Sequence, residues 1–67
     1  MEYQFWQHKT NDDIYAVELN SDYEPVGAYG PLNIQELKTE NLPLFKYDIY
    51  DVDYLISNMD NFRFYEI

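Results

Sequence analysis

The sequence has 67 residues and no cysteine, and its thirteen acidic residues against four basic ones give a formal net charge of −9 at pH 7. This length allows one domain over residues 1–67, and the absence of cysteine excludes disulfides and thiolate metal sites and fits a reducing cytoplasm. We expect a cytoplasmic protein without membrane contact, because Glu2 follows Met1, no signal-like apolar run comes after it, and no segment approaches the ~18 apolar residues of a membrane span.

The first half of the chain predicts a meander of three antiparallel strands. Runs rich in aromatic and β-branched residues are expected as strands over residues 2–8, 14–19 and 25–29. Turn-forming residues at 10–13 and 20–22 separate these runs. Pro25 fits the first position of a strand, where its missing N–H costs no ladder bond, and Gly30 with Pro31 closes the segment.

A short helix is expected next. Asn33 is a good N-cap, and Glu36 stands three residues later, as in a capping box. Pro43 cannot continue a helix and restricts the residue before it, so the helix is expected to end near Asn41.

A second helix is expected to start near Asp48 or Asp51 and to end where residues 58–61 break it. Its apolar residues recur at helical spacing, namely Ile49, Val52, Leu55, Ile56 and Met59. Residues 62–67 are expected as the last strand. The predicted class is therefore α+β, with a three-stranded meander plus a C-terminal strand in one small antiparallel sheet, two short helices on one face, and the order β-β-β-α-α-β.

The side chains that catalysis requires are few. His8 is the single histidine, and it lies two residues from Trp6 on one strand face, which is typical of an edge histidine beside an aromatic ring. Ser21 and Ser57 have no base near them in sequence, and the two glycines form no phosphate-binding loop. We expect neither enzymatic activity nor a cofactor.

A metal site is also not expected. Asp51 and Asp53 form a D-x-D pattern, but apolar residues follow where a calcium loop needs further oxygen ligands and a glycine. Together with Asp48 they also fit the start of a helix, where carboxylates interact favourably with the helix dipole. A small enzyme or metal-dependent domain is kept as a third alternative.

The acidic residues are concentrated in two windows that contain no lysine or arginine. Residues 10–37 and 47–62 together hold ten of the thirteen acids. A surface without bases attracts a basic partner and speeds its association. Basic protein surfaces commonly bind phosphates of nucleic acids, so an acidic face can compete with DNA or RNA for such a surface. The alternative is that the acidity only keeps the protein in solution.

Tyrosines interleave with these acids, and tyrosine is enriched among interface hot spots. The candidate partner-binding residues are Asp22, Tyr23, Glu24, Asp48, Tyr50, Asp51, Asp53 and Tyr54. On a helix, Tyr47, Tyr50 and Tyr54 would form one stripe. The alternative is that these three rings are half-buried against the sheet.

In size, charge and lack of catalytic groups, the chain resembles the small acidic proteins that bacteriophages and mobile elements make against host machinery. Those proteins include DNA mimics that block restriction enzymes, uracil-DNA glycosylase or CRISPR nucleases. The resemblance is compositional, so it assigns a role to no individual residue. It implies an anti-restriction or anti-CRISPR type of inhibitor that evades host defence.

Two functional hypotheses follow. The first is an inhibitor or modulator that binds a basic, nucleic-acid-handling host protein in the cytoplasm, without binding nucleic acid itself. The second is an assembly module that forms a homodimer through an edge strand, for which residues 2–8 and 62–67 are the candidate edges because few charges oppose pairing there.

Overall fold

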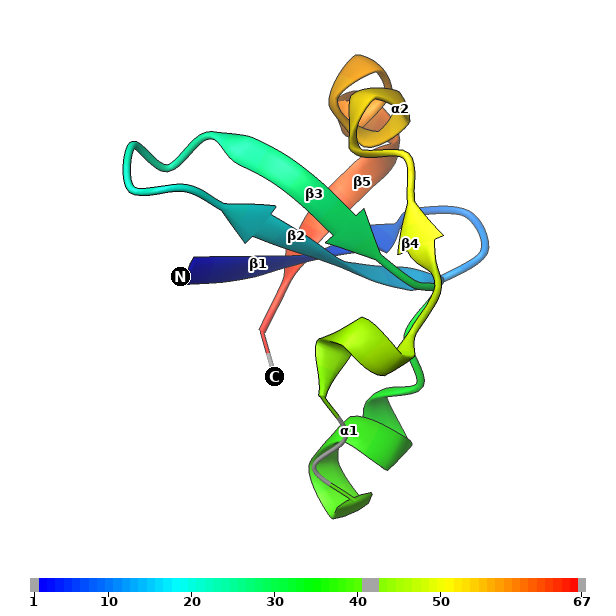
Figure 1. The fold of residues 1–67 in the computed structure, drawn as a ribbon. Helices are drawn as coiled ribbons and strands as arrows, with labels where there is room; N and C mark the ends of the chain where they lie inside the picture. The colour runs from blue at the N-terminus through cyan, green and yellow to red at the C-terminus, as the bar shows by residue number, and fades with distance from the viewer. Residues whose placement is uncertain (1, 41–42, 67) are drawn as a thin grey trace.

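The computed structural model describes residues 2–40 and 43–66, and these form one antiparallel sheet with two short α-helices (Figure 1). The sheet has the strand order β4-β3-β2-β1-β5. Its strands are β1 (Glu2–His8), β2 (Ile14–Leu19), β3 (Pro25–Tyr29), β4 (Ile49–Tyr50) and β5 (Phe62–Tyr65). The α+β class and the order β-β-β-α-α-β are confirmed.

The meander of β1, β2 and β3 is held by two turns that their own polar side chains organise. In the first turn, the Asn11 side chain accepts the Asp13 amide at 2.9 Å, and Asp12 takes a left-handed backbone with φ of 65°. In the second, Asn20 accepts the amides of Asp22 at 2.9 Å and Glu24 at 3.0 Å. Asparagine and aspartate bond nearby amides in this way more readily than most residues, so the predicted turns form where expected.

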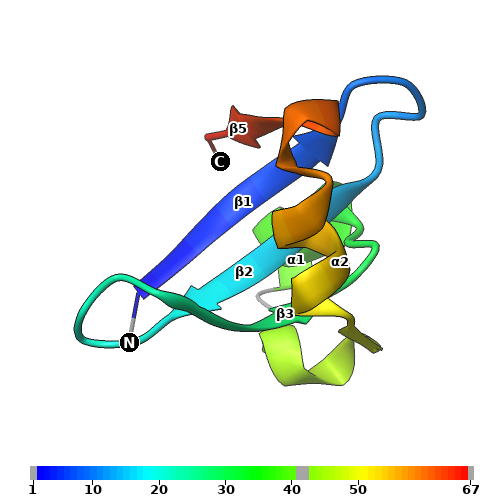
Figure 2. The ribbon, with the colours of Figure 1, turned by 90° about the horizontal axis from the view of Figure 1, so that it is seen from above.

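Helix α1 (Ile34–Glu40) begins at the predicted cap, since the Asn33 side chain accepts the Glu36 amide at 3.1 Å. The sequence predicts both helices on one face of the sheet. In the structure, α2 lies over one side of the sheet and α1 on the other, as two perpendicular views agree (Figure 1, Figure 2). The predicted helix end near Asn41 and the last residue of the predicted strand, Ile67, lie outside the described residues.

The second helix starts at the later of its two predicted positions, after Asp51, and ends before residues 58–61 as expected, whereas strand β4 was not predicted. Residues Leu44–Lys46 form a 3-10 turn, Ile49–Tyr50 is strand β4, and helix α2 spans only Val52–Ser57. The helix starts there because the Asp51 side chain accepts the amides of Asp53 at 3.0 Å and Tyr54 at 3.3 Å. A capping residue has a non-helical backbone, so the residues before Asp51 are free to pair with β3.

The core lies between the sheet and α2. Antiparallel pairing places Trp6 opposite Tyr15 and Val17 opposite Ala28, so these side chains share one face. Leu55 is the buried residue of α2 and packs into the same cluster. The full cluster is Trp6, Tyr15, Val17, Leu19, Ala28, Leu55 and Phe62. At roughly 1.5–3 kcal/mol for each large apolar side chain, this burial is the main stabilising contribution in so short a chain.

Strand β5 returns to pair with β1 on the side away from β2. A short 3-10 turn, Met59–Asn61, leads into it. Consequently residues 5–8 of β1 lie inside the sheet, so the prediction that residues 2–8 form an edge is wrong for residues 5–8, whereas β5 is an edge. Among the described residues, no helix is long and apolar enough to cross a membrane.

Candidate interaction surfaces

The turn between β2 and β3 presents the first group of predicted binding residues. Asp22, Tyr23 and Glu24 are all exposed, and the Tyr23 side chain is 69% exposed. Tyr23 has φ of 61°, and its amide donates to the Asn20 carbonyl at 2.9 Å. The turn therefore holds this aromatic ring away from the core, with a carboxylate on either side.

The second group lies at the start of β4 and α2. Asp48, Asp51 and Asp53 are exposed, and Tyr54 is 50% exposed. The side chain of Asp51 caps α2, so it has a structural role besides its charge. The carbonyl of Asp48 accepts the Gly30 amide at 2.9 Å, which ties this corner to the end of β3.

Folding does not bring these two groups together. The turn at Asp22 precedes β3, whereas β4 pairs with the far end of the same strand, Ala28 opposite Tyr50 (Figure 1). A strand of five residues spans roughly 17 Å, which exceeds the screening length of ~8 Å at physiological ionic strength. The predicted site is therefore two separate acidic groups.

Tyr50, in strand β4, packs against the hydrophobic core instead of joining a tyrosine stripe. Its ring lies 4.3 Å from the ring of Tyr15 and 6.2 Å from that of Tyr54, centre to centre. Tyr47 follows the 3-10 turn Leu44–Lys46, and its hydroxyl donates to Glu36 Oε1 at 3.2 Å. The expected stripe of Tyr47, Tyr50 and Tyr54 is absent because α2 starts only at Val52.

Tyr15 is a polar side chain within this core. It is 7% exposed, and burial, followed by the neighbouring Tyr50 side chain, raises the pKa of its hydroxyl from 10.0 to about 12. Burial also raises the pKa of Tyr3, with Glu18 adding to the effect. The Tyr15 hydroxyl therefore stays protonated to a higher pH than that of an exposed tyrosine.

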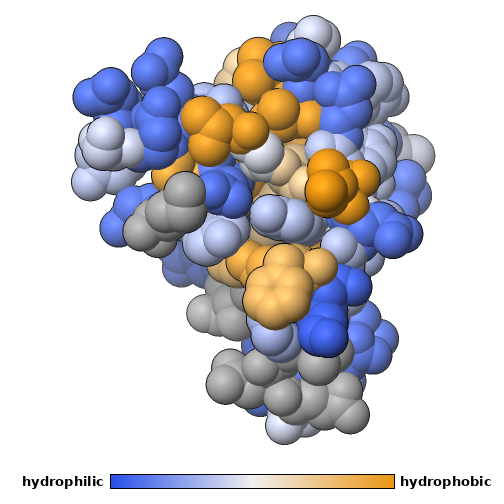
Figure 3. All heavy atoms as spheres, viewed as in Figure 1, coloured by the Kyte–Doolittle hydropathy of each residue, from blue (hydrophilic) through white to orange (hydrophobic). Residues whose placement is uncertain are grey.

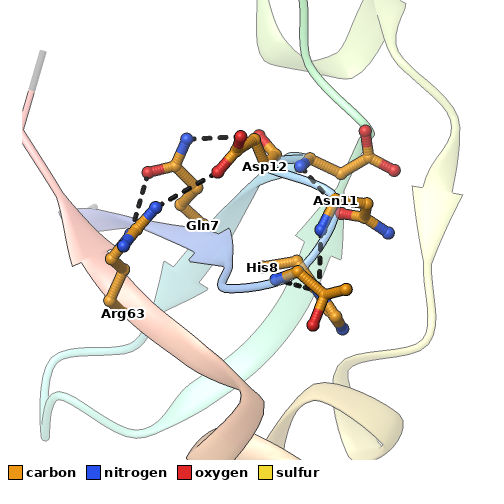
Figure 4. Close-up of polar contacts among 7 residues, drawn as sticks. Gln7, His8, Asn11, Asp12 and Arg63 are labelled. Atoms are coloured by element: carbon orange, nitrogen blue, oxygen red, sulfur yellow. Dashed lines mark hydrogen bonds and ion pairs between the residues drawn. The ribbon is translucent and has the colours of Figure 1, made fainter.

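Two of the four basic residues, Arg63 and Lys9, form polar contacts within the protein at the end of the sheet where β1 and β5 meet. Arg63 forms an ion pair with Asp12 at 3.1 Å, and its Nε donates to the Gln7 side chain at 3.2 Å (Figure 4). Lys9 donates from Nζ to the Asp60 carbonyl at 2.8 Å. Among the side chains that the structure describes, Asp12–Arg63 is the single ion pair. No base of the described residues therefore neutralises the carboxylates of the two predicted groups, although Asp51 also caps α2 and Glu24 accepts from the Asn20 side chain.

His8 has a structural role beside the same turn. Its Nδ1 accepts a hydrogen bond from the Thr10 amide at 3.1 Å (Figure 4). Its ring packs edge-to-face with that of Phe62, 5.0 Å from centre to centre. In the described part of the chain, no cluster of three or more His, Cys, Asp or Glu side chains is arranged to hold a metal ion.

A pocket lies beside the β5 edge, and none of its lining residues is among the predicted binding residues. It has a volume of about 220 Å³ and is lined by Trp6, Met59, Asp60, Phe62, Arg63 and Phe64. Phe64 is 72% exposed and Met59 52% exposed. The sequence signal was present in the alternation of Phe62 and Phe64 in the last strand, but the pocket forms only when that strand lies against Trp6.

Further apolar side chains are exposed on the side of the molecule seen in Figure 3. There, hydrophobic side chains lie among hydrophilic ones over α2, β3 and β4. Ile49 is 84% exposed and Val26 52% exposed. The acidic group at β4 and α2 therefore adjoins apolar surface.

Comparison with known proteins adds no relative. No protein-family model matches the chain, and no curated protein and no solved structure matches it.

Proposed function

We propose that this chain is a small acidic inhibitor or modulator that binds a basic surface of a nucleic-acid-handling protein. The observation that carries the proposal is the unpaired state of its exposed acids. Asp22, Glu24, Asp48 and Asp53 have no lysine or arginine at ion-pair distance among the described residues. A net charge of −9 opposes folding by self-repulsion, and binding a basic partner would relieve that repulsion.

The partner's class follows from the chemistry of basic surfaces. Lysine and arginine gather on proteins chiefly where phosphates are bound, so an acidic protein competes there with DNA or RNA. The likeness in size and charge to phage proteins that block host defence supports the same reading, including an origin in a bacteriophage or mobile element and action in the host cytoplasm. The two acidic groups would contact separate points of the partner.

The test is capture of the partner from a host lysate, followed by measurement of the affinity of the purified pair at low and high salt. We expect the dissociation constant to rise at least ten-fold between 0.05 and 0.5 M salt, on the order expected when several charge contacts are screened. Duplex DNA added at increasing concentration should displace the protein. An affinity that salt leaves unchanged would contradict the proposal.

Paired variants assign the two acidic groups. Asp48→Asn with Asp53→Asn removes charge at the start of β4 and α2 while the Asp51 cap remains. Asp22→Asn with Glu24→Gln removes charge at the β2–β3 turn. Each pair should weaken binding, about two- to five-fold at exposed sites, and both should flatten the salt dependence. A pair without either effect lies outside the interface.

The second candidate, a homodimer through an edge strand, now applies chiefly to β5, because β5 covers residues 5–8 of β1. The observation that favours it is that β5 is the last strand of the sheet and carries Phe64, which is 72% exposed. Sedimentation over a range of protein concentrations measures it, since a monomer at all concentrations contradicts it.

A further inference from the structure

The two edges of the sheet differ in how open they are to another strand. The β4 edge has only two residues, and Asp48 and Asp51 flank it. Short edge strands and nearby charges are the usual means by which proteins block strand addition. The β5 edge has four residues, and the side chain of its one charged residue, Arg63, is held by Asp12 and Gln7. The β5 edge is therefore the more accessible of the two.

The backbone of β5 presents unpaired groups at this edge. The Lys9 amide donates to the Asn61 carbonyl at 2.9 Å, and the register then places Gln7 opposite Arg63. Hydrogen-bonded and non-hydrogen-bonded pairs alternate along an antiparallel ladder. The backbone of Arg63 therefore forms hydrogen bonds with β1, whereas the backbone N–H and C=O of Phe64 point away from β1.

At Phe62, the next residue whose backbone groups point outward, only the carbonyl is unpaired. The Phe62 amide donates to the Met59 carbonyl, which leaves the Phe62 carbonyl directed outward. Among the described residues no strand lies beyond β5. Three outward groups, two from Phe64 and one from Phe62, are therefore available to a partner backbone.

The pocket lies beside these groups. Phe62 and Phe64 are two positions apart, so their side chains point to one face of the sheet, where Trp6 also lies. The Trp6 ring is 6.1 Å from Phe62 and 6.2 Å from Phe64, centre to centre. At about 220 Å³ the pocket is smaller than the ~300–1,000 Å³ of ligand sites. It suits an amino-acid side chain better than a small-molecule ligand.

We propose that β5 is a strand-addition site for an extended segment of a basic partner protein. The added strand runs antiparallel to β5, bonds the Phe64 N–H and C=O and the Phe62 C=O, and places an apolar side chain in the pocket against Trp6. Main-chain bonds supply affinity in this mode, and the pocket supplies specificity. The inference rests on the proposed function for the charge of the partner.

Charge disfavours a second copy of this chain as the occupant. Self-pairing centred on Arg63 sets Arg63 against its own copy and brings the Asp60 end of one strand to the Glu66 end of the other. Self-pairing centred on Phe64 sets Phe62 against Glu66. Like charges directly opposite each other destabilise the register centred on Arg63, and in the register centred on Phe64 an apolar ring meets a carboxylate while each copy carries a net charge of −9. A strand with lysines at its ends and alternating apolar residues between them avoids all of these contacts.

The test uses a defined peptide of the pattern Lys-Thr-Val-Thr-Val-Thr-Lys with blocked ends. In the described register its valines face Phe64 and Phe62, and its lysines face Glu66 and Asp60. Amide exchange is read by NMR on the intact protein. The Phe64 amide should exchange fast in the free protein, unlike that of Arg63, and should slow about ten-fold when the peptide stands at roughly nine times its dissociation constant.

Three control peptides separate the contributions. Glutamates in place of the lysines remove the charge match, serines in place of the valines empty the pocket, and N-methylation of the valine opposite Phe64 blocks its main-chain bond. Each should weaken binding about ten-fold or more, which corresponds to ~1.4 kcal/mol. Equal binding of the acidic peptide would overturn the basic character of the occupant.

Matched variants of the protein locate the site. Phe64→Thr keeps a strand-forming residue while it removes the exposed ring, and should weaken the lysine peptide about ten-fold. Phe45→Thr is the control, because Phe45 is 71% exposed against 72% for Phe64 but lies in the 3-10 turn after α1. Equal loss in both variants, or exchange protection confined to β4 and α2, would overturn the inference.

These outcomes are distinct from failure of the proposed function. If the captured partner binds with steep salt dependence but Phe64→Thr binds it as the natural protein does, strand addition is wrong and the proposed function stands. If the peptide occupies β5 and the captured partner is insensitive to salt, the basic partner is wrong in both proposals. Concentration-dependent dimers that Phe64→Thr abolishes would assign the edge to a second copy.

Discussion

Gly30 is a residue whose identity the fold requires. It has φ of +144°, a backbone region that side chains with a Cβ rarely adopt. A Cβ built on it would lie 2.7 Å from Cδ1 of Tyr15 and 3.0 Å from the carbonyl oxygen of Ile14. Because its own amide bonds the Asp48 carbonyl, Gly30 joins the end of β3 to the corner that carries the second acidic group.

We therefore expect Gly30→Ala to destabilise the protein by about 1–3 kcal/mol, through backbone strain and overpacking against Tyr15. Gly27→Ala is the matched control, since the nearest atom to its added Cβ is the Glu18 carboxylate at 4.0 Å. Urea unfolding followed by tryptophan fluorescence measures both. The prediction fails if the two variants unfold at the same urea concentration.

At the scale of single residues, the sequence predicted contacts between neighbours in the chain better than contacts between distant strands. The capping of α1 by Asn33 follows from a spacing of three residues, and the bond to the Glu36 amide confirms it. Gly30 was predicted only to close the meander. Its positive φ and its contacts with Tyr15 and Ile14 depend on how β2 and β3 pair, which neighbouring residues do not specify.

Helix α2 is the element on which both the core and the second acidic group depend. It has only six residues, too few to be stable alone. Its fully buried Leu55 and the side-chain cap of Asp51 hold it on the sheet. The charge of Asp51 thus serves the fold as well as any partner.

We expect Asp51→Ala to cost about 0.5–2 kcal/mol of stability, because two amides of α2 lose their acceptor. Asp51→Asn should retain most of the stability, since its side-chain oxygen can still accept. Asp48→Ala removes an equal charge nearby, and its bond to Gly30 comes from the backbone carbonyl. Thermal unfolding compares the three variants, and equal losses in Asp51→Ala and Asp48→Ala would exclude the capping role.

The helical spacing that runs from Ile49 to Met59 predicted a helix starting near Asp48 or Asp51, and the structure confirms the start after Asp51. Ile49 and Tyr50 pair with Tyr29 and Ala28, which lie about twenty residues earlier in the sequence. Apolar residues at this spacing also occur when a short strand precedes a short helix. The pairing with β3 decides between the two, and a pattern of apolar residues alone does not contain it.

At the scale of the whole molecule, the dominant feature is charge with few internal partners. The base-free windows were visible in the sequence, and the exposed acids of the two groups lie in them. Their separation along β3 was not predictable, because it depends on the strand register. The pocket beside β5 was equally hidden, since Trp6 and Phe64 are brought together only by the pairing of the first strand with the last.

We expect the protein to become more stable as salt rises from about 0.01 to 1 M, because the screening length falls from ~30 to ~3 Å and repulsion among the acids weakens. The measurement is the urea midpoint at each salt concentration. The variant with Asp22→Asn and Glu24→Gln carries two fewer charges, so its midpoint should depend less on salt. A midpoint that falls with salt would show that attraction at Asp12–Arg63 outweighs the repulsion.

The pairing of β1 with β5 also determines when the fold can close. Gln7 and Arg63 are 56 residues apart in sequence yet hydrogen-bonded. Contacts between such distant residues form late, because the loop between them must be ordered first. During synthesis on the ribosome, β1 therefore remains unpaired on its outer side until β5 emerges. For that interval the nascent chain exposes Trp6 and a bare strand edge, a surface that chaperones or a neighbouring nascent chain can bind.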